Sequence, residues 1–197
     1  MGLIDRAKNI MVQPKAEWSV IDTEPDTVGG LYTRYIIPLS LLQVGAWLIG
    51  AVLFGQSIAF ITTIHTTTTG TLVAIACGSL IASLVLVYLV AFVVDGLAPT
   101  FGGTKNSIQA LKVSAYSFTA YWVFGLLSIV PPIGWIGFFL GFYSFYLLYL
   151  GLPALMKSPA EKTFGYAVVT VVVGIVLFFL VRLLLGILGL GAGYAMR

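Results

Sequence analysis

Long apolar stretches constrain the fold of this chain more than any other feature of its sequence. A helix needs roughly 20 consecutive apolar residues to cross a bilayer, and the sequence offers five such stretches. They are expected at about 36–60, 71–94, 112–130, 133–156 and 164–190. Charged residues make up 9% of the chain, whereas a soluble domain has about 25%. The sequence therefore predicts an all-α fold, a polytopic membrane helix bundle with five transmembrane helices.

The first 35 residues differ from the rest because they carry four basic and five acidic side chains. Apolar residues at helical spacing before Pro14 predict a short N-terminal amphipathic helix. These residues are Leu3, Ile4, Ala7, Ile10 and Met11. The helix can lie in the membrane interface or pack under the loops of the bundle, and Trp18 suits the headgroup level. We therefore expect a tail at residues 1–35 and a transmembrane domain at residues 36–197.

Lysine and arginine residues gather on one side of the expected membrane. The tail and the loops after the second and fourth spans hold eight of them, and the other loops hold none. The eight are Arg6, Lys8, Lys15, Arg34, Lys105, Lys112, Lys157 and Lys162. Only Arg197 follows the fifth span. The positive-inside rule then predicts a cytoplasmic N-terminus and an outward-facing C-terminus.

The composition argues against several functions. Cys77 and His65 are the only cysteine and histidine, so neither a metal cluster nor a thiol–imidazole pair is expected. The sequence has no phosphate-binding glycine loop, no paired catalytic carboxylates and no basic patch for nucleic acid. We therefore expect no enzyme, no catalytic, cofactor-binding or metal-binding residues, no cofactor and no nucleic-acid partner.

The stretch DGLAPTFGG, residues 95–103, follows the second expected span. A carboxylate at a helix C-terminus opposes the helix dipole, so Asp95 needs a partner, which could be Lys105, Lys112 or a backbone turn. One interpretation is an Asp-Gly turn in which the carboxylate bonds its own loop. The other is a carboxylate used for docking or ion handling.

Arg182 lies within the fifth expected span. A charge at mid-bilayer costs roughly 3 kcal/mol on insertion scales and is expected to face protein or water. Polar residues at a matching depth are Gln56, Ser79 and Ser128. Arg182 can therefore extend outward to the headgroups or line a polar cavity.

Three tyrosines, Tyr143, Tyr146 and Tyr149, follow one another at intervals of three in the fourth expected span. Their hydroxyl groups need partners in the bilayer. Hydrogen bonds between helices, worth about 0.6 kcal/mol each, are one explanation. The lining of a polar path is the other.

Two longer motifs resemble the Yip family of five-span membrane proteins in its compact bacterial form. They are DGLAPTFGG with the following TKNSIQALKVSAYS, which contains Tyr116, and YSFYLLYLGLPALMKSP. The N-terminal LIDRAKNIMVQPKAEW also resembles bacterial members. The resemblance implies a bacterial inner-membrane protein, and it agrees with the periplasmic C-terminus predicted from the charge distribution. It also implies that Gly96, Pro99, Gly102 and Gly103 hold one defined cytoplasmic turn, with positive φ or close backbone approach at Gly102 and Gly103.

Eukaryotic members of this family are implied to bind Rab-type GTPases through cytoplasmic segments. This chain lacks their long cytoplasmic N-terminal region, so we do not expect a Rab-type GTPase as its partner. The partners that we expect are membrane lipids and either a protein at the cytoplasmic face or a second copy of the chain.

Three functions fit these features. The first is a non-enzymatic scaffold or adaptor that docks a partner or lipid headgroups on the cytoplasmic face. Segments around Asp95, around Lys157 to Lys162, and around Lys15, Glu17 and Trp18 are expected to converge there. The second is a channel or transporter with a polar path lined by Arg182 and the three tyrosines. The third is a membrane-shaping or lipid-handling protein that uses the amphipathic helix.

Overall fold

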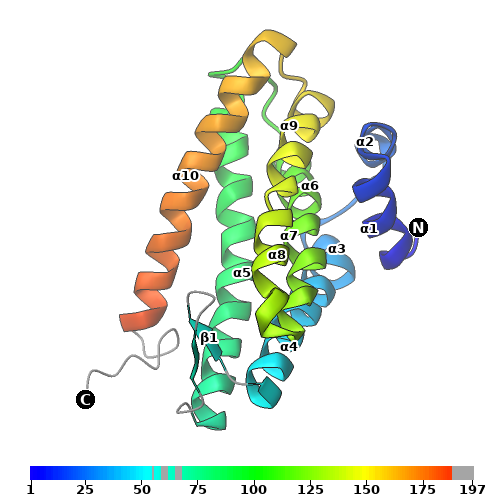
Figure 1. The fold of residues 1–197 in the computed structure, drawn as a ribbon. Coiled ribbons are helices and arrows are strands. Elements are labelled where there is room, and N and C mark those ends of the chain that lie inside the picture. Colours follow the sequence, from blue (N-terminus) through cyan, green and yellow to red (C-terminus); the bar gives the residue numbers. More distant parts are fainter. Residues whose placement is uncertain (55, 59–61, 65–67, 188–197) are drawn as a thin grey trace.

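The computed structural model describes residues 1–187 with the exception of 55, 59–61 and 65–67. His65 and Arg197 lie outside the described residues. The tail forms α1 (Leu3–Val12) and α2 (Pro14–Thr23). Pro14 ends the first helix and begins the second, since proline at the first helical position lacks only an N–H that would be unpaired there. The tail helices lie beside the bundle, α2 against α9 and α1 against α7 (Figure 1).

The remaining elements form the bundle. In chain order they are α3 (Val28–Leu31), the π-helix η1 (Tyr32–Ile36), α4 (Ile37–Phe54), β1 (Gln56–Ile58), β2 (Thr62–Ile64), α5 (Thr69–Leu97), α6 (Ser107–Ser117), α7 (Thr119–Gly125), the 3₁₀-helix η2 (Leu126–Ile129), α8 (Pro131–Leu140), α9 (Tyr143–Met156) and α10 (Ala160–Ile187). The two short strands pair antiparallel, with Gln56 opposite Ile64. The chain descends through α4, ascends through α5, descends through α6 to η2, ascends through α8 and α9 and descends through α10 (Figure 1).

The expected all-α membrane fold is confirmed, but the count of five spans is not. The described residues contain four helical segments long and apolar enough to cross a membrane, at Val28–Phe54, Thr69–Leu97, Pro131–Met156 and Ala160–Ile187. The third expected span, 112–130, is divided among α6, α7 and η2, with a break at Phe118. Its first helix also begins earlier than expected, at Ser107, and includes Lys112.

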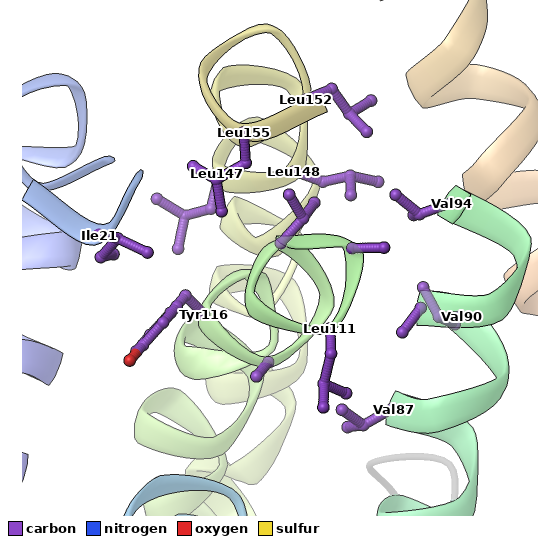
Figure 2. Close-up of a cluster of buried hydrophobic side chains, with 14 of the residues drawn as sticks. Ile21, Val87, Val90, Val94, Leu111, Tyr116, Leu147, Leu148, Leu152 and Leu155 are labelled. Atoms are coloured by element: carbon purple, nitrogen blue, oxygen red, sulfur yellow. The ribbon is translucent and has the colours of Figure 1, made fainter. Parts of the chain in front are cut away.

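Helix α6 forms the centre of the bundle. Its residues from Ala110 to Ser117 are all buried, and a helix that is buried on every side belongs to a core rather than to a surface. Figure 2 shows Leu111 and Tyr116 of this helix among side chains from α2, α5 and α9. Those labelled neighbours are Ile21, Val87, Val90, Val94, Leu147, Leu148, Leu152 and Leu155. The central helix thus places Lys112 and Tyr116 in contact with the tail.

Helix α10 has the opposite character. Large apolar side chains cover its outer surface from Phe164, which is 70% exposed, to Ile187, which is 73% exposed. Such a surface suits lipid rather than water. Its contacts with the rest of the bundle are made to α5 and α9.

Candidate functional site

Arg6 ties the two tail helices together in the interior. Its side chain is 6% exposed, and Nη1 donates to Oε1 of Glu17 at 2.5 Å while Nη2 donates to Oε2 of Glu24. The guanidinium also lies 5.8 Å from the centre of the Tyr116 ring. Burial lowers the pKa of Arg6, but the bond to Glu24 and the neighbouring carboxylates raise it more, so that the pKa lies above its ordinary value. Arg6 therefore remains a cation that is fully paired.

Two lysines complete the attachment of the tail to the bundle. Lys112 of α6 is 3% exposed and donates through Nζ to the carbonyls of Ile21, at 2.9 Å, and Glu24, at 2.5 Å. Lys157, after α9, pairs with Asp22 at 2.6 Å. We call these charged groups the tail clamp. It consists of Arg6, Glu17, Asp22, Glu24, Lys112 and Lys157.

Trp18 is the apolar counterpart of the clamp. It is 1% exposed and lies so close to Gly151 of α9 that a Cβ on this glycine would come 2.8 Å from Cζ2 of the indole. Trp18 therefore does not present its indole on the surface, and Glu17, 5% exposed, is not available on the surface to a partner. Burial of Trp18 against α9 removes apolar surface from water, whereas Glu17 is buried together with its ion-pair partner Arg6.

The tail helix is packed against the bundle, which was one of its two expected positions. Tyr143 supports it from α9 by donating its hydroxyl to the carbonyl of Met11 at 3.1 Å. The outer face of α1 still exposes Ile4, at 80%, and Val12, at 67%. The buried face of α1 therefore carries one charge, Arg6, beside the apolar Ile10.

Asp95 does not lie at the mouth of a loop, because α5 continues to Leu97. Its Oδ1 atom is buried without a hydrogen-bond partner in the described chain. Neither expected lysine pairs with it. Lys112 bonds the tail instead, and Lys105 is exposed. Gly96 is also helical and exposed, and a side chain there would meet nothing within 4 Å.

The loop itself is a glycine-terminated helix end. The N–H of Gly103 donates to the carbonyl of Ala98 at 2.8 Å, and the N–H of Gly102 donates to the carbonyl of Pro99 at 3.1 Å. These are the two bonds of a Schellman motif, which requires a left-handed residue. Gly102 supplies it with a φ of 75°, as predicted from the FGG sequence. Gly103 supplies the predicted close approach, since a Cβ there would come 2.7 Å from the carbonyl oxygen of Met156.

This loop is joined to the turn between α9 and α10 at the same end of the bundle (Figure 1). The N–H of Thr104 donates to the carbonyl of Met156 at 2.8 Å. Phe101 stacks on Tyr166, with ring centres 5.0 Å apart. Lys157 begins the second turn in a left-handed conformation, with a φ of 57°. The two turns form one surface, which we call the loop-end face. Its exposed polar side chains include those of Thr100, Thr104, Lys105, Asn106, Lys157, Glu161 and Lys162.

Arg182 lies in a separate part of the molecule. It lines a cavity of about 300 Å³ between α4, α5, α7 and α10, together with Gln43, Ser83 and Tyr121. Its Nη1 donates to Oγ of Ser79 at 3.2 Å, which confirms that Ser79 lies at the matching depth. Phe178 lies 5.5 Å from the guanidinium, measured to the ring centre. Of its two expected orientations, the structure shows the one toward a cavity.

The three expected tyrosines do not line this cavity. Tyr143 faces the tail, and Tyr146 and Tyr149 are 43% and 39% exposed on the outside of α9. A polar path that combines them with Arg182 is therefore not formed by the described residues. Tyr116 of α6 contacts the tail, with the centre of its ring 6.2 Å from that of Trp18 and 4.6 Å from that of Tyr35.

Comparison with known proteins identifies the family. The Yip1 domain model matches residues 8–181. The chain belongs to the Yip1 domain family. Its relatives include the inner membrane protein YohC of Escherichia coli, in strain K12 and in O6:H1 strain CFT073, each 25% identical over 193 residues and covering 92% of this chain and 93% of the relative. No solved structure matches. The Yip1 assignment confirms the resemblance carried by the loop and tyrosine motifs.

Sequence reasoning missed the tail clamp and the polar lining of the Arg182 cavity. One signal was available for the clamp. Arg6 follows Leu3 by three positions and precedes Ile10 by four, so it lies on the apolar stripe of α1 and had to be buried with a partner. Its carboxylate partners are 11 and 18 residues away, and no local pattern selects them. In the described part of the chain, no three His, Cys, Asp or Glu side chains are grouped as a metal site would need.

Proposed function

We propose that this Yip1-family membrane protein is a non-enzymatic scaffold or adaptor that docks a protein partner on its loop-end face. The observation that carries this proposal is the division of the charges at that end of the molecule. Arg6, Glu17 and Lys112 are paired inside the protein, within the tail clamp. Lys105, Glu161 and Lys162 are exposed.

The shape of this face supports the same function. Backbone bonds from Gly103 and Thr104 fix the loop, and the stacked pair Phe101–Tyr166 lies beneath it. A surface fixed before binding loses little conformational entropy when a partner docks. Exposed charges of both signs give selectivity between partners and affect the association rate.

The orientation is part of the proposal. The two turns that form the loop-end face lie at one end of the bundle (Figure 1) and carry Lys105, Lys157 and Lys162, and the positive-inside rule favours a cytoplasmic location for this end. A reporter that is active only in the cytoplasm, inserted after Lys105, is expected to be active. A reporter that is active only in the periplasm, fused after Arg197, is expected to be active as well. A silent reporter at Arg197 contradicts the five-span topology.

Photocrosslinking in cells tests the docking function. A photoreactive residue at Thr100 is expected to yield a discrete protein adduct, because this exposed position lies beside the charged groups. The same probe at Val130, exposed at the opposite end, is the control. The double variant Lys105→Glu, Lys162→Glu should abolish the Thr100 adduct at unchanged protein abundance. An adduct that survives this charge reversal, or no adduct at all, overturns the proposal.

A further inference from the structure

Within the part of the chain that the structure describes, the guanidinium of Arg182 has no anionic partner. All seven acidic side chains of the sequence lie in the described residues, and none of them is within ion-pair distance of Arg182. The cations of the four ion pairs in the described chain are Arg6, Arg34 and Lys157. A guanidinium has five N–H donors, and Ser79 accepts from one of its nitrogens. Most of its donor capacity is therefore available to a bound anion.

The cavity around Arg182 supplies further polar groups for such an anion. The side chains of Gln43, Ser83 and Tyr121 line it along with Ser79. Its volume of about 300 Å³ exceeds the roughly 30 Å³ that one water molecule occupies in the liquid by a factor of ten. Ser83 is also held in place, since it accepts a hydrogen bond from Nε1 of Trp122 at 3.1 Å. The site is thus large and partly preorganised.

A second, apolar cavity of about 210 Å³ continues from the first between α10 and the helices α5, α6, α8 and α9. The two share Leu86, Phe118, Tyr121 and Phe178 in their linings. Ile175 of α10 and Phe142 of α8–α9 line the apolar cavity and are 47% and 46% exposed. Because these side chains are also on the outer surface, the apolar cavity is a groove that reaches the lipid-facing side of the bundle.

The position of Arg182 along α10 suits a headgroup. The 19 residues between Lys162 and Arg182 contain no charge. At 1.5 Å per residue this stretch is about 30 Å long, which matches the thickness of the hydrocarbon layer. The two cations of α10 can therefore lie at opposite surfaces of the bilayer.

We propose that Arg182 and its cavity bind the phosphate of an anionic phospholipid, one acyl chain of which occupies the adjoining groove. A cation joined to an apolar groove is complementary to an amphiphile with a negative headgroup. A guanidinium can bond a phosphate through two parallel N–H groups. A soluble anion would use the polar cavity alone and would leave the groove without an occupant.

Native mass spectrometry of the full-length protein, released from detergent, tests this site. Dioleoylphosphatidylglycerol and dioleoylphosphatidylcholine have the same chains and differ in net charge. The parent protein is expected to prefer the anionic lipid on the order of tenfold. Arg182→Gln should abolish this preference and Arg182→Lys should retain part of it. Arg34→Gln, which removes an exposed arginine, is the matched control and should leave the preference unchanged.

The groove has its own matched pair of variants. Gly174 lines the groove, and Gly174→Leu should reduce the binding of both lipids. Gly186 on the same helix has no neighbour within 4 Å of an added Cβ, and Gly186→Leu should have no effect. Equal binding of the two lipids by the parent protein, or a preference that survives Arg182→Gln, overturns the proposal. Glycerol phosphate that binds as tightly as the lipid also overturns it, because the chain would then contribute nothing.

Discussion

Arg6 and Arg182 are both set among apolar side chains, but their partners differ. Arg6 has two carboxylates and an aromatic ring, whereas Arg182 has a serine hydroxyl and an aromatic ring. The first arrangement completes the charge balance inside the protein. The second leaves a positive charge beside a cavity. A buried ion pair is costly to break when one partner is removed, while an uncompensated charge is costly as it stands.

The difference extends to the two regions around these arginines. Near Arg6, the tail, α6 and α9 are in close contact, with Trp18 and Leu111 each 1% exposed. Near Arg182, the helices leave a cavity and a groove. The close packing of the first region stabilises the fold. The second region has the properties of a binding site, since function often requires a site that is packed less tightly than stability alone would favour.

Arg6→Leu should have the largest effect on the free energy of unfolding. Glu17 would remain buried without a cation, and removal of one partner from a buried pair costs about 3–5 kcal/mol. Thermal and denaturant unfolding in detergent measure this loss, and limited proteolysis reports the release of the tail. Arg34→Leu breaks the exposed pair with Asp26, in which the arginine is 72% exposed, and should cost less than about 1 kcal/mol. Equal costs for both variants would remove the distinction between the two pairs.

Gly102→Val should have an intermediate effect. A β-branched residue in the left-handed region is strained, and such strain costs on the order of 1–3 kcal/mol. Pro159 also lies 3.3 Å from the position of the new Cβ. Gly96→Val is the control, because the helix there has open space beside it. A melting temperature of Gly102→Val equal to that of Gly96→Val would show that the loop geometry does not support the packed region.

Arg182→Leu should have the smallest effect on stability, less than about 1 kcal/mol. The hydrogen bond to Ser79 is lost, which costs about 1 kcal/mol, but the unpaired charge is removed at the same time. Unfolding in detergent without added lipid measures the change. A destabilisation as large as that of Arg6→Leu would mean that the protein itself neutralises Arg182, and the comparison between the two arginines would fail.

The fold was largely predictable because it depends on the lengths of apolar stretches, which the sequence displays directly. The turn at Gly102 was predictable for a similar reason, since the left-handed residue of a helix end is usually glycine. The third expected span is not confirmed, because α6, α7 and η2 divide it into shorter pieces. Polar side chains such as Lys112 and Ser114 lie within it and find partners in the core, and only tertiary contacts reveal those partners.

The candidate sites were less predictable than the fold. A nearby lysine was one of the partners considered for Asp95, along with a backbone turn, but Lys112 bonds the carbonyls of Ile21 and Glu24, about 90 residues earlier in the sequence. The depth of Ser79 and Arg182 could be counted along two helices, so their matching depth was predicted, but the hydrogen bond between them was not. The cavity around them could not be, because it arises from the way α7 and α10 are placed against α4 and α5.

The contact between Trp18 and Gly151 also has a consequence in time. These residues are 133 positions apart in the sequence, so a ribosome that adds roughly 5–20 residues per second makes the second on the order of ten seconds after the first. Until then α9 has not been synthesised, and the tail can contact neither Lys157 nor the surface at Gly151 against which the indole of Trp18 packs. During this interval the nascent tail is not docked on α9. Its charged side chains are hydrated, and its apolar side chains can already contact the membrane. Docking of the tail is a late step of biogenesis, and it marks the moment at which the fourth helical pass of the bundle is in place.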